Sequence, residues 1–196
     1  MDEVGRGALA GPVSVGAVMI HAAAISGSPP PGLADSKALS PKRREQLVEP
    51  ITNWANETAV GHATSKEVDQ IGILGALRFA GHRALQQIQA SSQTRLSHGG
   101  AVVLLDGNHD WLTSTSMPGE APPVQLVLKG DSLSATIAAA SVIAKVTRDA
   151  AMKALDLEHP EYQWASNKGY ASEAHQAAIR RLGTTSYHRV SWRLPQ

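Results

Sequence analysis

The sequence predicts a single α/β domain in which helices cover a mixed β-sheet. Residues 101–105 are a continuous apolar run, which is typical of a strand buried on both faces, and residues 124–128 are predicted as a second apolar strand. Residues 12–20 place every second side chain, from Val13 to Met19, on one apolar face. Segments with helical spacing separate these strands, and that order favours a mixed sheet with helices packed on it. With 196 residues, the chain is long enough to bury the core of one domain.

Local signals mark the first predicted helix. Residues 26–34 are rich in proline and predict a loop. Ser40 and Pro41 predict a helix start, because serine caps helices and proline suits the first helical position. Pro50 predicts that this helix kinks or ends there, since proline has no amide to donate.

A second strand and a long helix are predicted next. The strand covers residues 58–64, and we expect Ser65 to cap the helix that follows it. Apolar residues then recur at helical spacing in an amphipathic segment. They are Leu74, Leu77, Gly81, Leu85 and Ile88. The polar segment 89–100 predicts a loop before the buried strand at 101–105.

The second half repeats the order of strand and helix. Residues 110–123 predict an irregular loop, and Ser134 is expected to cap an alanine-rich helix from about Ala135 to Leu157. Its alanines allow close approach to the sheet. Ser172 predicts the start of a short helix that ends at Gly183.

Composition limits the chemistry that is available. The chain has no cysteine, so a metal would need oxygen or imidazole ligands, which favours Mg²⁺ or Mn²⁺ over structural zinc. No apolar run approaches the roughly 20 residues that span a bilayer, and no leader is visible, so we expect a soluble cytoplasmic protein. Residues 1–141 have a net charge of −2 and residues 142–196 one of +3. That asymmetry fits a metal site beside a phosphate-binding surface, or ordinary charge scatter.

The first residues combine two acids with a glycine-flanked arginine. Asp2 and Glu3 precede Gly5-Arg6-Gly7. Neighbouring side chains on a strand point to opposite faces, so the two acids would need a bend in the chain to reach one site. The glycines leave backbone amides open to a ligand, and Arg6 offers donors suited to phosphate. The stretch predicts a metal-dependent phosphodiester site, although surface acids beside glycine turns are common.

Two further acids follow the buried strands. Asp106 comes directly after residues 101–105, and Asp131 comes shortly after 124–128. Ligand sites in open α/β sheets gather at the carboxyl ends of strands. With Asp2 and Glu3 they make four carboxylates, which suit two divalent cations that clamp a phosphoryl displacement. Any one of them alone is more often a turn or cap residue.

Several ordered segments resemble one known family, the bacterial type 2 ribonucleases H (ribonuclease HII), over nearly the whole chain. The segments are Asp2–Gly7 with Ala10–Val13, Asp35–Lys37, Asp106–Asn108, Lys129–Asp131, Ala138–Asp149, Lys168–Tyr170 and His188–Trp192. The resemblance implies a ribonuclease H-like fold, with a five-stranded mixed sheet flanked by helices. It also implies one catalytic domain over residues 1–196, of which about 158–196 form a helical substrate-binding part.

The resemblance further implies an endonuclease that hydrolyses RNA in RNA–DNA hybrids and incises duplex DNA at embedded ribonucleotides, as in ribonucleotide excision repair. The products would carry 3′-hydroxyl and 5′-phosphate ends. The residues that match the catalytic and metal-binding acids are Asp2, Glu3, Asp106 and Asp131, for Mn²⁺ or Mg²⁺ with two ions at turnover. The matching readers of the ribose 2′-hydroxyl are Gly5, Arg6, Gly7 and Tyr170. Such a reader is useful, because the 2′-hydroxyl distinguishes RNA from DNA. We expect a monomer with no membrane partner.

Other charged and aromatic residues have two readings each. Lys37, Lys145 and Arg148 either contact substrate phosphates or have structural roles, and His188 and Arg189 either line the substrate path or are structural. The spacing of Asp149 from Lys145 and Lys153 favours a surface ion-pair ladder. The four tryptophans, at positions 54, 111, 164 and 192, are expected to anchor the core or loops.

Two alternatives remain at this point. Family members usually have several apolar residues before the Asp-Glu pair, whereas only Met1 precedes Asp2 here. Either the start lies upstream or the strand is short, and a catalytically impaired hybrid-binding relative is therefore the alternative function. A metal phosphatase for small molecules would share the acids, but it leaves Gly5-Arg6-Gly7 and Tyr170 unexplained.

Overall fold

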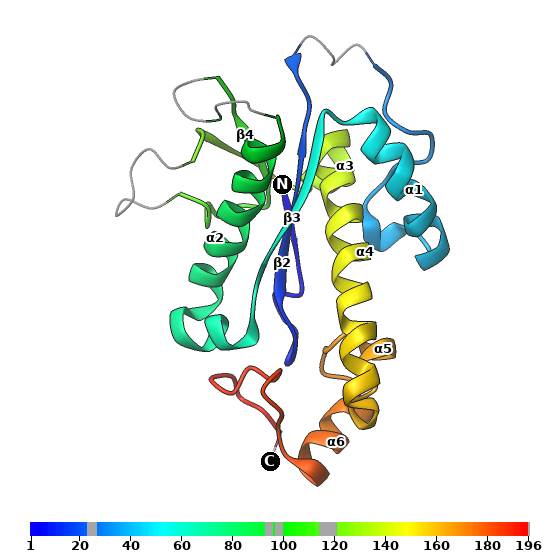
Figure 1. Cartoon of the computed structure of the whole chain (residues 1–196), viewed down its shortest axis with the longest axis vertical. Helices are drawn as coiled ribbons and strands as arrows, with labels where there is room; N and C mark the ends of the chain where they lie inside the picture. Colours follow the sequence, from blue (N-terminus) through cyan, green and yellow to red (C-terminus); the bar gives the residue numbers. More distant parts are fainter. Residues whose placement is uncertain (23–26, 93–95, 97–99, 114–120, 196) are drawn as a thin grey trace.

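The computed structural model describes residues 1–22, 27–92, 96, 100–113 and 121–195 (Figure 1). The strands in chain order are β1 (Asp2–Val4), β2 (Val13–Met19), β3 (Glu57–Ala63), β4 (Val103–Asp106) and β5 (Val124–Val127). The helices are η2 (Ser36–Ala38), α1 (Pro41–Trp54), α2 (Ser65–Ser92), α3 (Gly130–Leu133), α4 (Ala135–Glu158), η3 (Pro160–Tyr162), α5 (Trp164–Asn167) and α6 (Glu173–Leu182). Parts of the three predicted loops, residues 26, 93–95 with 97–99, and 114–120, lie outside the described residues.

The strands form a mixed arrangement around the chain's N-terminus. β1, β2 and β3 pair in that order as an antiparallel group, and β4 pairs with β5 in parallel. Met1 joins the two groups, because its amino group donates to the Leu104 carbonyl (2.6 Å) and its carbonyl accepts from the Asp106 amide (3.1 Å). Among the described residues, the predicted five strands with mixed pairing are confirmed, divided between a three-stranded antiparallel sheet and a two-stranded parallel sheet, and β1 contacts β4.

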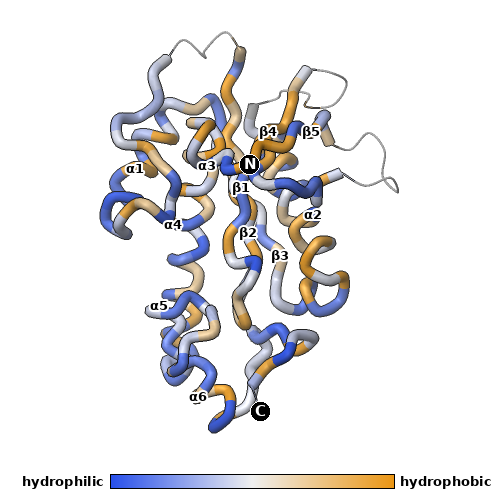
Figure 2. The backbone as a smooth tube through the Cα atoms, turned by 180° about the vertical axis from the view of Figure 1, so that it is seen from behind, coloured by the Kyte–Doolittle hydropathy of each residue, from blue (hydrophilic) through white to orange (hydrophobic). Residues whose placement is uncertain are grey.

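Helices α2 and α4 cover opposite faces of the antiparallel strands (Figure 1). Small residues allow the close packing. A Cβ atom at Gly16 on β2 would lie 2.3 Å from the Ala140 carbonyl oxygen of α4, and one at Gly61 on β3 would lie 1.9 Å from the Ala80 carbonyl oxygen of α2. The predicted close approach of the alanine-rich helix to the sheet is therefore confirmed. Hydrophobic residues concentrate in β4 and its surroundings, as the orange tube of Figure 2 shows.

Three predicted helix boundaries were wrong in detail. Thr64, not Ser65, caps α2, because its hydroxyl accepts from the Glu67 amide (3.2 Å) while the Glu67 carboxylate accepts from the Thr64 amide (2.8 Å). The same helix continues to Ser92, into the segment predicted as a loop, and contains a non-helical Gly72 (φ 71°). Ser134 precedes α4, but its hydroxyl bonds to that of Thr136 and caps no amide.

Pro50 does not end α1, which continues to Trp54. The last turn is held by tertiary packing, because the fully buried Ile51 lies in a core cluster with Val142 of α4. The energy of that burial, about 1.5–3 kcal/mol, offsets much of the cost of a proline within a helix, about 3 kcal/mol.

The C-terminal elements pack around the far end of α4. α5 and α6 lie there in Figure 1, and the tail that follows α6 returns to the connection between β1 and β2. Ala10 pairs with His188 across an isolated antiparallel bridge. Trp111 and Trp164 are buried, and Trp54 and Trp192 pack against core clusters, which confirms the tryptophans as anchors. Among the described residues, no helix is both long and apolar enough to span a bilayer.

Candidate active site

A cavity of about 320 Å³ gathers most of the predicted site residues. It lies where β1 turns into the Gly5-Arg6-Gly7 segment, between η2 and α4. Its lining residues are Asp2, Glu3, Val4, Gly5, Arg6, Gly7, Ser36, Lys37, Ser141, Lys145 and Tyr170. Residues that are up to 168 positions apart thus share one hollow.

Asp2 and Glu3 both line this cavity despite being neighbours on β1. Asp2 is buried, and its Oδ1 accepts from the Glu3 amide (2.8 Å). Burial raises the pKa of Asp2 to about 7, and the nearby charges of Glu3 and Asp106 add to that rise. Burial also raises the pKa of Glu3, against the opposing effect of Arg6, whose Nη1 lies 3.4 Å from Glu3 Oε1. The chain has therefore placed like charges close together, which a bound cation would stabilise.

Asp106 and Asp131, on β4 and α3, do not line this cavity, but both interact with residues that do. Asp106 Oδ1 accepts from the Gly130 amide (2.7 Å), and Asp131 is buried with its Oδ2 3.8 Å from Lys37 Nζ. Burial by itself would lower the pKa of Lys37, but four acids raise it overall. In order of effect these are Asp35, Asp2, Asp131 and Asp106. The Lys37 ammonium therefore faces three of the four predicted acids.

This donor set suits Mg²⁺ or Mn²⁺. Carboxylate oxygens are the ligands that these hard cations prefer, and a divalent ion would offset the burial, and the smaller repulsion by Glu3 and Asp106, that raise the pKa of Asp2. Within the described ranges, no three acidic or histidine side chains are close enough to form a ready-made metal site. Mg²⁺ usually keeps several waters, so carboxylates that hold it need not all converge on one point.

The Gly5-Arg6-Gly7 turn forms the wall beside the acids. Gly5 has φ +82°, and a Cβ atom there would lie 2.1 Å from Arg148 Nε, so only glycine fits. Gly7 is different, because a Cβ atom would meet nothing within 4 Å. The Gly7 side of the turn is therefore open, as a surface that admits a ligand must be.

Tyr170 approaches the turn from the C-terminal part. Its side chain is 38% exposed, and its backbone carbonyl accepts from His175 Nδ1 (2.8 Å). The preceding Gly169 carbonyl accepts from the amides of Leu9 (2.8 Å) and Ala10 (3.2 Å). These contacts bring an exposed aromatic ring to the cavity that the two N-terminal acids line.

Lys145 also lines the cavity, where its ammonium pairs with Asp149 (2.7 Å). The predicted ladder is confirmed only for this pair. The second partner of Asp149 is Arg44 (3.7 Å) and not Lys153, which pairs with Glu45 (3.6 Å). Both new partners come from α1, which packs against α4.

Of the two readings of Arg148, the structure favours a structural role over a phosphate contact. Arg148 is fully buried, and its guanidinium donates to the carbonyls of Pro12, Lys168 and Ala10. His188 and Arg189 do not line a substrate path either, since both are buried. Burial therefore speaks against direct substrate contact by these three residues, because distant backbone segments bring carbonyl and imidazole partners that the local sequence does not reveal.

Ser36 and Ser141 are lining residues that the sequence reasoning missed. The Ser36 amide donates to Ser141 Oγ (3.1 Å), which ties η2 to α4 at the edge of the cavity. One signal was available, because Ser141 lies four residues before Lys145 and hence on the same helical face.

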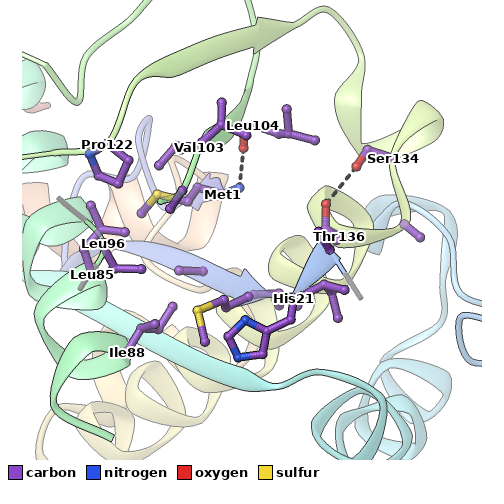
Figure 3. A pocket seen from close by; sticks show the side chains of 18 of the residues that line it. Met1, His21, Leu85, Ile88, Leu96, Val103, Leu104, Pro122, Ser134 and Thr136 are labelled. Atoms are coloured by element: carbon purple, nitrogen blue, oxygen red, sulfur yellow. Dashed lines mark hydrogen bonds between the residues drawn. The ribbon is translucent and has the colours of Figure 1, made fainter. Parts of the chain in front are cut away.

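A larger cavity of about 560 Å³ lies elsewhere and is lined mainly by apolar side chains (Figure 3). Met1, Leu85 and Val103 contribute to it, whereas none of the four predicted acids does. Its chemistry offers no carboxylate set, so we place the candidate active site in the smaller cavity.

Sequence comparisons point to one family. The family model for ribonuclease HII matches residues 1–194. The chain is 45% identical over 194 residues to ribonuclease HII of Streptomyces avermitilis, covering 98% of this chain and 75% of the relative. It is 43% identical over 192 residues to ribonuclease HII of Chromohalobacter salexigens, covering 98% of this chain and 86% of the relative.

Solved structures share the fold. An Archaeoglobus fulgidus chain, solved as a complex of PCNA and RNase HII, matches with a TM-score of 0.69 at 22% identity, over 97% of this chain and 91% of that one. Bst-RNase HIII in complex with Mn²⁺ matches with a TM-score of 0.70 at 18% identity, over 98% and 65%. The matches give no support to a catalytically impaired relative. The chain belongs to the ribonuclease HII family, the metal-dependent type 2 ribonucleases H, endonucleases that act on RNA–DNA hybrids.

Proposed function

We propose that this chain, besides cutting the RNA of hybrids, incises duplex DNA at single embedded ribonucleotides and leaves 3′-hydroxyl and 5′-phosphate ends. One observation carries the proposal: a single cavity is lined by two adjacent acids, a glycine-flanked turn and an exposed tyrosine. The acids suit the cleavage chemistry, and the turn with the tyrosine suits the recognition of one sugar.

In this proposal Asp2, Glu3, Asp106 and Asp131 hold Mn²⁺ or Mg²⁺. The oxygen-only donors and the raised pKa of Asp2 support this assignment. When bound, the ions supply activation of the attacking water and stabilisation of the leaving 3′-oxygen. Asp106 is fixed by the Gly130 amide, which keeps one carboxylate oxygen oriented and leaves the other available.

The reader of the ribose consists of Gly5, Arg6, Gly7 and Tyr170. Backbone amides in the turn can donate to a 2′-hydroxyl oxygen, and the tyrosine ring can pack against the sugar or base beside it. The open space at Gly7 supports close approach by the nucleic acid.

Lys37 and Lys145 are the proposed phosphate contacts, since both line the cavity. Lys37 has an 80% exposed side chain, so its ammonium is open to a phosphate although it lies 3.8 Å from Asp131. Residues from about 158 to 196 act in the proposal as the substrate-binding part of one domain, because they carry Tyr170. We propose a cytoplasmic monomer, because one chain lines the whole cavity and DNA is its substrate.

The deciding experiment is incision of a duplex that carries one ribonucleotide, in Mg²⁺, Mn²⁺ or EDTA. We expect metal-dependent cutting on the 5′ side of a phosphate, with a 3′-hydroxyl that a polymerase can extend. Thermal unfolding with Mn²⁺ gives a second readout, since binding to the folded state raises Tm. Cutting of uniform hybrids alone, or equal cutting in EDTA, would refute the proposal.

A further inference from the structure

The underside of the Gly5-Arg6-Gly7 turn rests on one buried guanidinium. Arg189 donates from Nη2 to the Gly5 carbonyl (2.7 Å), from Nη1 to the Arg6 carbonyl (2.9 Å) and from Nη2 to the Gly11 carbonyl (3.1 Å). The side chain is fully buried. In the described part of the chain it has no ion-pair partner, which is an expensive state for a charge unless its donors are satisfied.

These contacts orient two successive peptide planes. In a trans peptide the N–H points away from the C=O, and the described chain has no cis bond. The Gly5 carbonyl shares its plane with the Arg6 amide, and the Arg6 carbonyl shares its plane with the Gly7 amide. Because Arg189 holds both carbonyls inward, both N–H groups face away from the core. Neither amide donates to another group among the described residues.

A second buried arginine joins the turn to the tyrosine. Arg148 binds the Lys168 carbonyl (2.9 Å), and its guanidinium carbon lies 5.6 Å from the centre of the Tyr170 ring. The same side chain packs directly behind Gly5. One residue thus contacts both halves of the cavity wall.

We propose that Arg189, supported by Arg148, is a positioning residue that sets selectivity for a ribose 2′-hydroxyl by fixing the outward direction of the Arg6 and Gly7 amides. The inference rests on the proposed reader role of this turn. The role requires a planar fork of donors, because two successive carbonyls of the turn and that of Gly11 must be met at once. The single ammonium of lysine keeps the charge without that geometry.

The test compares Arg189→Lys with wild type on two substrates, a duplex with one ribonucleotide and a uniform RNA–DNA hybrid. We expect kcat/KM on the single-ribonucleotide duplex to fall about tenfold more than on the hybrid, because the hybrid presents many sites and phosphate contacts persist. Arg83→Lys is the matched control. Arg83 also binds a carbonyl, that of His62 (2.6 Å), and the Glu67 carboxylate, but it lies on α2 outside the cavity. For Arg83→Lys, the ratio of kcat/KM on the single-ribonucleotide duplex to kcat/KM on the uniform hybrid is expected to stay at the wild-type value.

An unchanged ratio in a folded Arg189→Lys protein with lowered Tm would mean a purely structural role and overturn the inference. Tyr170→Ala separates this from failure of the proposed function. If Tyr170→Ala shifts the ratio and Arg189→Lys does not, only the inference fails, whereas an unchanged ratio in Tyr170→Ala rejects the reader itself.

Should Arg189→Lys fail to fold, the wild-type enzyme still tests the premise of the inference, that the Arg6 and Gly7 amides face the 2′-hydroxyl. Its ¹⁵N–¹H resonances for Arg6 and Gly7 would be followed with Ca²⁺ in place of Mn²⁺ to hold back cleavage. We expect both amides to shift with the single-ribonucleotide duplex and not with an all-DNA duplex of the same sequence. Equal responses to the two duplexes would reject the reader role of the turn and overturn the inference that rests on it.

Discussion

The Asp106 carboxylate accepts a 2.7 Å hydrogen bond from the backbone amide of Gly130. The acid at the end of β4 therefore also fixes the start of the short helix α3, which carries Asp131. A Cβ atom at Gly130 would lie 3.2 Å from Asp106 Oδ1 and 2.5 Å from Ile137 Cδ1, so the position has little room for any side chain. Two of the four acids are thus positioned by one contact.

Replacement of either acid by its amide should remove cleavage without unfolding the protein. Asp106→Asn keeps an oxygen that can accept from Gly130, and Asp131→Asn loses only a 3.8 Å contact to an exposed lysine. Loss of a metal ligand costs several kcal/mol in the transition state, so we expect incision to fall at least about 100-fold. Tm should change by less than about 4 °C, equivalent to about 1 kcal/mol. The exposed Glu173→Gln serves as the control, and full activity in both amide variants would contradict the metal site.

Tyr170 should matter for the choice of substrate more than for binding. Truncation by Tyr170→Ala removes an exposed ring and leaves the backbone carbonyl bound to His175. We expect kcat/KM on a single-ribonucleotide duplex to fall at least about tenfold, or about 1.4 kcal/mol, while affinity for a uniform hybrid stays within about twofold. Parallel losses on both substrates, measured by incision and by filter binding, would argue against a reader.

The two glycines of the turn should differ in what they affect. Gly5→Ala imposes a positive φ on alanine, at about 1 kcal/mol, and drives its methyl group into Arg148. We expect a loss of at least about 2 kcal/mol of stability in urea unfolding. Gly7→Ala has open space, so its stability should match wild type while incision at ribonucleotides falls. A stable Gly5→Ala protein would contradict the packing behind the turn.

His188 should make stability depend on pH. Burial, with His175 next to it, lowers the pKa of His188 to about 4 from its ordinary 6.5. Its Nδ1 accepts from the Thr185 amide (3.0 Å), which suits a neutral ring. The unfolded chain therefore binds the proton first as pH falls. The contribution of the neutral His188 ring to the free energy of unfolding is complete above about pH 6.5. It is lost as the pH falls from about 6.5 to 4, by up to about 3 kcal/mol.

Urea midpoints at pH 7.5 and 4.5 test this prediction. Other groups also titrate in this range, so the comparison is the difference between the two midpoints in each variant. His188→Asn should show a smaller difference than wild type, and the exposed His21→Asn should show the wild-type difference. An identical difference in all three proteins would mean that His188 does not titrate as its surroundings imply.

Much of the fold follows from local patterns in the chain. β4 and β5 occupy most of the apolar segments at 101–105 and 124–128, but the expected burial on both faces was wrong, because Val102, Leu126 and Leu128 are exposed. The alanines of α4 indicate close packing before any partner is known. The end of α1 was misjudged because the burial of Ile51 against α4 outweighs the local effect of Pro50. Local preference decides an element only where distant contacts do not oppose it.

The sequence by itself determined the candidate acids, the glycine-flanked turn and the tyrosine, because residue type and order carry that chemistry. Only the tertiary structure decided the roles of the charged residues around them. Arg148 and Arg189 look like surface cations in the chain, yet they are fully buried. Arg189 meets its carbonyl partner at Gly5 across 184 positions. A cationic side chain that is exposed to water can bind phosphate, whereas one that is buried among carbonyls binds the backbone. Which of these environments surrounds it depends on the tertiary fold.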